Sequence, residues 1–350
     1  MASVAASLQR TRNALGGNLG TWIFYGVGIA AFLVLIVPRI AQSPTYFVQI
    51  LLFGISQGAI YALVALGYTL VYGIIELINF AHGDVFTLGG FVSLTLFGAI
   101  GIAPQHTGNF GWLILPIIVA VMVVTMLITG GVNVLIERVA YRPLRNAPRL
   151  APLITAIGMS FVIEGALFVW KGPNYLPFPD LLPAIRIPIG GGATVGVKDL
   201  IVIGVVVVLV VALTLFVSRT KLGKAMRATA QDRDAALLMG IDINRTIAAT
   251  FFIGAALAGA GGLIYGLYFT SNLYFQLGFS AGLAAFTAAV LGGIGNIQGA
   301  ALGGLIIGLI RTFNDGYGRS EWSDVLVFAI LVLVLVFRPN GLLGMQVPNK

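Results

Sequence analysis

Residues 246–310 read TIAATFFIGAALAGAGGLIYGLYFTSNLYFQLGFSAGLAAFTAAVLGGIGNIQGAALGGLIIGLI, a run of 65 residues without one charged side chain. One helical crossing of a bilayer needs about 20 apolar residues, so this run can hold more than one membrane-spanning helix. Residues 13–38 and 85–136 are also uncharged, and 58% of the chain is hydrophobic while 9% is charged. A β-barrel would alternate polar and apolar residues, which residues 201–217 do not. The predicted fold class is all-α, a polytopic transmembrane helical bundle.

The positive charges predict which loops face the cytoplasm. The net charge is +8, and the basic residues gather in loops, as the positive-inside rule expects. Two such clusters are Arg138, Arg142, Arg145 and Arg149, and Arg219, Lys221, Lys224, Arg227, Arg233 and Arg245. Between them, residues 171–198 hold five of the fourteen prolines and cannot form a membrane helix, so they are predicted to be an outer loop.

The spans can be ordered on this basis. The N-terminal apolar stretch is longer than a signal-peptide core and lacks a clear cleavage site, so it is predicted to be a retained span. Residues 292–296, GGIGN, predict a helix break between two short helices. The count is about nine spans, within a range of eight to ten, and both termini are predicted to be cytoplasmic. The predicted helical segments are residues 21–38, 47–75, 85–103, 112–136, 151–170, 199–218, 247–269, 278–294, 297–311 and 325–337.

Small residues recur at intervals of four on two predicted helices. Such ladders let helix backbones approach closely. They fit ordinary packing within the chain, and they also fit a homodimer seam or a moving gate. The two ladders are Gly254, Ala258, Gly262 and Gly266, and Gly295, Gly299 and Gly303.

Few ionisable residues are predicted to lie at membrane depth, where such residues are functional candidates. Glu164 lies inside a predicted span, either as a pathway residue or as a structural hydrogen-bond partner of a neighbouring helix. The segment containing Glu76, Asn79, His82 and Asp84 is either an interfacial turn or the inner mouth of a pathway. Non-helical backbone at membrane depth must be covered by protein or line a cavity, which adds the break residues. The candidate pathway or gate residues are therefore Glu76, Asn79, His82, Asp84, Glu164, Gly292, Gly293 and Asn296.

Catalytic and metal chemistry are not expected in this chain. It has two histidines and no cysteine, so no histidine–cysteine metal site can form. It also lacks the G-x-x-x-x-G-K-[ST] phosphate-binding loop. If ATP energises transport, ATP and Mg must be bound by a partner subunit.

Residues 219–245, RTKLGKAMRATAQDRDAALLMGIDINR, form the one long polar segment with helical character. Asp234, Ala235 and Ala236 are followed by Gly240, which suits the end of a helix. This acid-Ala-Ala-x-x-x-Gly spacing resembles the coupling loop of ABC importer permeases, with Asp where Glu is usual. A solvated connecting helix is the plainer alternative.

Other segments strengthen the resemblance. They resemble the branched-chain amino acid ABC permease family, in particular the shorter, high-affinity leucine/isoleucine/valine permease type, over nearly the whole chain after about residue 45. The resemblance divides the chain into a permease domain, residues 46–345, and an N-terminal extension with an extra anchor, residues 1–45. The segments are 78–84 (INFAHGD) with Gly89 and Gly90, 141–145 (YRPLR), 223–232 (GKAMRATAQD), 239–241 (MGI) and 338–344 (RPNGLLG).

The resemblance implies a bacterial inner-membrane importer. A periplasmic or lipid-tethered binding protein would deliver substrate to two permease subunits, here a heterodimer, and two cytoplasmic ATPases would drive the change of access through residues 219–245. Similar permeases carry urea or short amides, so these remain an alternative substrate. An ATP-independent secondary transporter or channel is a further alternative. Partners of another class, such as nucleic acid, are not expected.

Overall fold

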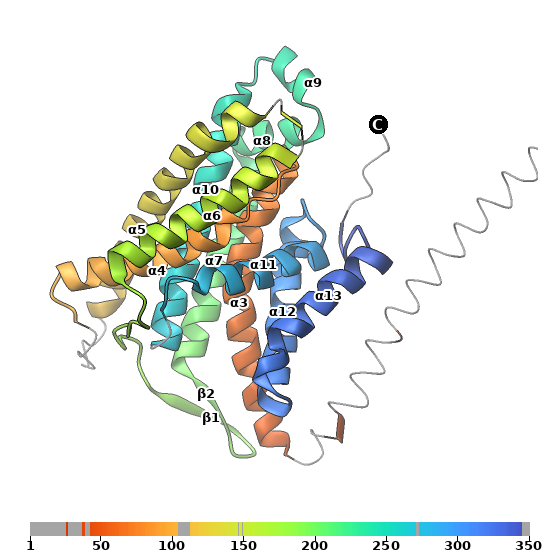
Figure 1. Ribbon diagram of the computed structural model, residues 1–350. Coiled ribbons are helices and arrows are strands. Elements are labelled where there is room, and N and C mark those ends of the chain that lie inside the picture. The colour runs from red at the N-terminus through yellow and green to blue at the C-terminus, as the bar shows by residue number, and fades with distance from the viewer. Residues whose placement is uncertain are drawn as a thin grey trace, which may run out of the picture.

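The computed structural model describes residues 26, 37–38, 43–103, 113–145, 147–148, 150–270 and 273–344. In these ranges the chain is a bundle of long helices with one two-stranded sheet (Figure 1), so the predicted all-α class is confirmed. The predicted first span, residues 21–38, and the extension that contains it lie largely outside the described residues. The basic residues Arg10, Arg12, Arg149 and Lys350 lie outside them as well.

The long helices coincide with the predicted segments. Seven helices in the described ranges are long and apolar enough to cross a membrane, near the predicted eight to ten; α4 and α11 fall outside that set. The chain is therefore a multi-pass membrane protein. In order, the long helices are α3 (Pro44–Ile75), α4 (Ala81–Ala99), α5 (Ile114–Ile136), α6 (Leu150–Lys171), α7 (Val197–Arg219), α10 (Ile243–Phe269), α11 (Leu277–Gly292), α12 (Ile297–Tyr317) and α13 (Ser323–Phe337).

Two boundary predictions were wrong for physical reasons. Residue 311 was expected to end a span because it is charged, but α12 continues to Tyr317 since Arg311 finds partners inside the protein. Helix α4 begins at Ala81, not at residue 85, so His82 and Asp84 lie in its first turn. Helix α5 ends at Ile136, as predicted, and is followed directly by a π-helical turn (Glu137–Tyr141) and a 3-10 turn (Arg142–Leu144).

Helices α3 and α10 form the centre of the bundle. In each, 78% of the most apolar 18-residue stretch is buried, against 17% in α7 and in Ser320–Phe337. The small-residue ladder of α10 explains this position: Gly254 lies on Gly67 of α3, and Gly262 lies on the backbone of α4 near Phe86. In this structure the ladder is used for packing within the chain.

Helix α12 packs equally closely. An added methyl group at Gly304 or Gly308 would overlap the α3 backbone at Ala62 or Gly58. On its other side, Gly299 and Gly303 approach the backbone of α11. The second predicted ladder therefore serves the α11–α12 contact, again within the chain.

Two polar structures lie at opposite ends of the bundle (Figure 1). One is an antiparallel hairpin in the predicted outer loop, formed by β1 (Arg186–Gly190) and β2 (Ala193–Gly196). The other is the segment 219–245, which was expected to contain one polar helix and instead holds two, α8 (Lys221–Gln231) and α9 (Arg233–Leu238). The break occurs at Asp232, which is extended and caps α9 with its side chain.

Candidate functional site

Helix α9 carries the predicted coupling residues, and local capping explains its shape. Asp232 Oδ1 accepts hydrogen bonds from the Asp234 and Ala235 backbone nitrogens at 2.9 and 3.0 Å, so this short helix begins on a satisfied N-cap. The chain then turns at Gly240, whose φ of +79° favours glycine. Ala236 is buried, while Asp234 and Ala235 are exposed.

The tip of this segment is apolar and uncovered. Leu237, Leu238 and Met239 are 60%, 88% and 82% exposed. Exposed groups of large apolar side chains mark protein or membrane interaction sites. We call residues 237–239 the apolar tip.

The segment is attached directly to the central helix. Arg233 Nη2 donates a hydrogen bond of 2.9 Å to the carbonyl oxygen of Ile74, in the last turn of α3. The carbonyls in that turn lack helical partners, so the guanidinium satisfies one of them. Next to it, Glu76 ends α3 in the left-handed region with a φ of 54°.

A cavity of about 510 Å³ lies between this segment and the bundle. Glu76, Tyr141, Arg145 and Asp232 are among the residues that line it. Arg145 forms an ion pair with Glu137 and donates to Asn244 Oδ1 at 2.7 Å, which connects the turn after α5 with the start of α10. Burial lowers the pKa of Arg145 from its usual value, and the Glu137 carboxylate opposes that shift.

Three of the predicted pathway residues lie in one buried polar cluster next to this cavity. Asn79, His82 and Asp84 are at most 1% exposed. The Tyr141 hydroxyl donates a hydrogen bond of 2.7 Å to Asn79 Oδ1. The His82 and Tyr68 rings pack edge to face, with their centroids 4.8 Å apart. The INFAHGD segment therefore forms a turn and a helix start inside the protein, and of its candidates only Glu76 faces the cavity directly.

A fourth predicted pathway residue, Glu164 of α6, lies next to this cluster. Ser160, one helical turn before Glu164, donates its hydroxyl to Asp84 Oδ2. Glu164 is 9% exposed and lies close enough to Asp84 for the two carboxylates to interact electrostatically. Asp84 Oδ1 has no hydrogen-bond partner among the described residues. Across the described ranges, no group of three or more His, Asp or Glu side chains could hold a metal ion.

The remaining predicted residues, Gly292, Gly293 and Asn296, lie elsewhere, at the turn between α11 and α12. Residues 338–344 cover this turn: the Leu342 and Leu343 backbone nitrogens donate to the carbonyls of Leu291 and Gly292 at 2.8 and 2.9 Å. Asn296 Nδ2 donates to the Leu343 carbonyl at 2.8 Å. We call residues 338–344 the C-terminal clamp. The break is therefore covered by protein and is separate from the Asp84 cluster.

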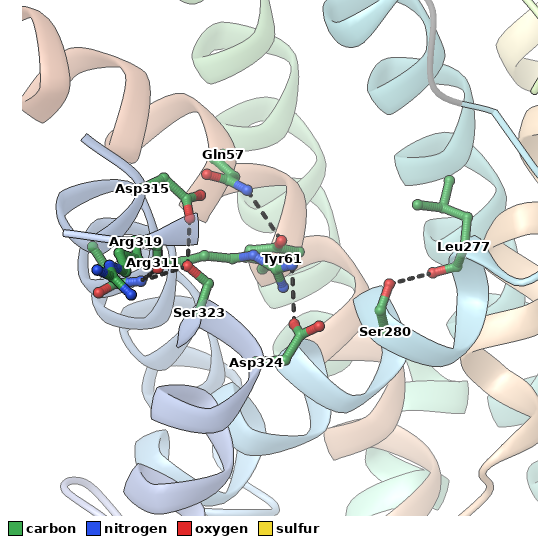
Figure 2. Close-up of polar contacts among 10 residues, drawn as sticks. Gln57, Tyr61, Leu277, Ser280, Arg311, Asp315, Arg319, Ser323 and Asp324 are labelled. Atoms are coloured by element: carbon green, nitrogen blue, oxygen red, sulfur yellow. Dashed lines mark hydrogen bonds and ion pairs between the residues drawn. The ribbon is translucent and has the colours of Figure 1, made fainter. Parts of the chain in front are cut away.

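A second polar network, which the sequence analysis missed, joins α3, α12 and α13 near the hairpin end (Figure 2). Arg311 forms an ion pair of 3.0 Å with Asp324 and lies 6.0 Å from the centroid of the Tyr61 ring. Gln57 donates to Tyr61 at 3.1 Å and accepts from Thr312 at 2.7 Å. The signal in the sequence was Arg311 itself, a single cation that ends a 65-residue uncharged run.

Comparison with known proteins agrees with this architecture. Residues 50–335 match the family described as branched-chain amino acid transport system / permease component. The chain is 40% identical over 306 residues to the high-affinity branched-chain amino acid transport system permease protein BraD of Pseudomonas aeruginosa, covering 85% of this chain and 96% of BraD. It is 41% identical over 304 residues to the protein of the same description, LivH, of Escherichia coli K12, with the same coverage.

A more distant relative carries a different name. The autoinducer 2 import system permease protein LsrC of Enterobacter sp. strain 638 is 29% identical over 198 residues, which cover 54% of this chain and 55% of LsrC. No solved structure matches the chain. The extent of the family match and the identity to BraD and LivH decide the assignment: this chain is a transport component and not an enzyme, and it belongs to the branched-chain amino acid transport system permease family.

Proposed function

We propose that this chain is the permease subunit of an ATP-driven importer and forms the translocation path for branched-chain amino acids delivered by a periplasmic or lipid-tethered binding protein. The names of its relatives support the substrate. The geometry of residues 219–245 supports the ATP-driven mechanism.

The observation that carries the proposal is the contact between Arg233 and the Ile74 carbonyl. It joins the segment that ends in the exposed apolar tip to α3, one of the two most buried of the seven span-length helices. A partner protein that binds the apolar tip could therefore transmit its movement to α3, because no flexible linker lies between the tip and this helix. Asp234, Ala235, Ala236 and Gly240 are the proposed coupling residues.

We propose the following partners. The apolar tip docks one of two cytoplasmic ATPase subunits, which bind ATP and Mg. A second, different permease subunit completes the path, and membrane lipid covers the remaining apolar faces. The protein belongs in a bacterial inner membrane, with residues 219–245 and both termini on the cytoplasmic side.

The test is uptake of labelled leucine and labelled urea by proteoliposomes that contain this chain with its neighbouring permease, ATPases and binding protein. ATP-dependent leucine uptake is expected. ATP-dependent urea uptake would keep the mechanism and replace the substrate, and flux that does not respond to ATP would overturn the ATP-driven assignment.

Coupling through α9 predicts a specific effect of Gly240→Val. A β-branched residue at a φ of +79° is strained by about 1–3 kcal/mol, so the turn after α9 should shift. We expect ATP-driven leucine uptake to fall by about tenfold or more while the chain still inserts in the membrane. Gly204→Val on α7 is the control, because an added Cβ atom there meets no atom within 4 Å. Normal uptake by Gly240→Val would contradict the proposed coupling.

A further inference from the structure

A second cavity, of about 620 Å³, lies at the hairpin end of the bundle, opposite the coupling segment. Its walls come from the start of α3, the β1–β2 hairpin, the start of α7 and the ends of α10 and α12. One part is apolar, with Ile50, Leu52 and Phe53 of α3. Another part is charged, with Arg186 and Lys198 as cations and Asp199 and Asp315 as anions.

Two of these four charges are already used by the protein. Asp199 accepts hydrogen bonds from Ser56 at 3.0 Å and from the Tyr268 hydroxyl, which joins α3, α7 and α10. Lys198 forms an ion pair with Asp180. Both therefore hold the walls of the cavity in place.

The other two charges, on Arg186 and Asp315, belong to exposed residues of the cavity wall. Neither Arg186 nor Asp315 forms an ion pair with any residue in the described ranges. Asp315 accepts a hydrogen bond from Ser323 (Figure 2) and is attracted by Arg311, but the ion pair of Arg311 is with Asp324. Arg186 on β1 and Asp315 on α12 thus offer opposite charges from two different elements that line one cavity.

We propose that this cavity receives a zwitterionic α-amino acid with an aliphatic side chain. Arg186 binds the carboxylate, Asp315 binds the ammonium group, and the apolar wall around Phe53 contacts the side chain. Charge-assisted hydrogen bonds of this kind are the strong ones in proteins. The inference rests on the proposed import function and deepens it: a neutral urea or amide has no full charge for either residue, whereas an amino acid has one for each.

The experiment uses the reconstituted importer and compares Arg186→Gln and Asp315→Asn with matched controls. Arg319→Gln and Glu321→Gln remove one charge of each sign from exposed residues that do not line the cavity. The readouts are leucine transported per ATP hydrolysed and stimulation of the ATPase by the loaded binding protein. We expect each cavity variant to lower the transport ratio about tenfold and to leave stimulation intact, with both controls close to wild type.

Other outcomes separate this inference from the import function. If wild type shows no ATP-driven leucine uptake, the proposed function fails. If wild type transports leucine and the cavity variants match the controls, the cavity assignment alone is overturned. If the cavity variants lose both ATPase stimulation and uptake, Arg186 and Asp315 belong to the contact with the binding protein, and the cavity assignment is overturned as well. Arg186→Lys and Asp315→Glu keep their charges and should retain most uptake; equal loss in these variants would contradict a charge-based site.

Discussion

Single glycines set the distance between the central helices, and the clearest case is Gly308 of α12. An added methyl group there would overlap the backbone of Gly58, which no side-chain rotation can relieve. We therefore expect Gly308→Ala to destabilise the fold by about 1–3 kcal/mol and to lower the midpoint of thermal unfolding in detergent. Gly131→Ala on α5 is the control, since a methyl group there meets no atom within 4 Å, and it should not lower the midpoint because alanine favours a helix more than glycine does. Equal midpoints for the two variants would contradict the close α3–α12 contact.

Among the helices, α9 is too short to be stable alone, so its cap has a large effect. Asp232→Ala removes the acceptor of two backbone hydrogen bonds, a loss of about 1 kcal/mol. Backbone amides in Arg233–Leu238 should then exchange with deuterium faster by about fivefold, measured by mass spectrometry. Asp232→Asn keeps an N-cap acceptor and should exchange as wild type does. Asp242→Ala, which removes the equivalent cap of α10, should affect only the first turn of that helix; faster exchange in α9 for this control would show that the effect is not local.

On the scale of the whole molecule, the coupling segment and the hairpin lie at opposite ends of the bundle (Figure 1). The chain contains no cysteine, so single cysteines can report which side each end faces. Leu238→Cys at the apolar tip and Ile189→Cys on β1 replace residues that are 88% and 54% exposed. A membrane-impermeant maleimide should label Leu238→Cys only in inside-out vesicles and Ile189→Cys only in right-side-out vesicles. Labelling of both from one side would contradict the proposed orientation.

Much of this architecture could be predicted, because long hydrophobic runs indicate membrane-spanning helices and clusters of basic residues indicate cytoplasmic loops. The helical segments after residue 43 matched their predicted positions within a few residues, apart from α12 and the start of α4. The exceptions have a common cause. The predicted helix ends were placed at charged or polar residues, but His82, Asp84 and Arg311 each lie against groups from other helices, such as Tyr68, Ser160 and Asp324.

The candidate site was predictable to a smaller extent, because it depends on contacts between residues that are far apart in the chain. The sequence made Asn79, His82, Asp84 and Glu164 candidate pathway residues, and the structure buries all four inside the protein. The link between Arg233 and Ile74 joins residues 159 positions apart, so no local pattern could indicate it. The cavity at the hairpin end likewise depends on Arg186 and Asp315, which are far apart in the chain and line one cavity because the hairpin packs against the start of α3.

The C-terminal clamp also affects how the protein is made. Its backbone donors satisfy the last carbonyls of α11, yet residues 338–344 leave the ribosome after everything that they contact. During synthesis, the Leu291 and Gly292 carbonyls therefore lack these two donors until residues 338–344 have been made. We expect a chain truncated after Phe337 to keep the residues of every described long helix and to lose the hydrogen bonds that join residues 338–344 to the end of α11.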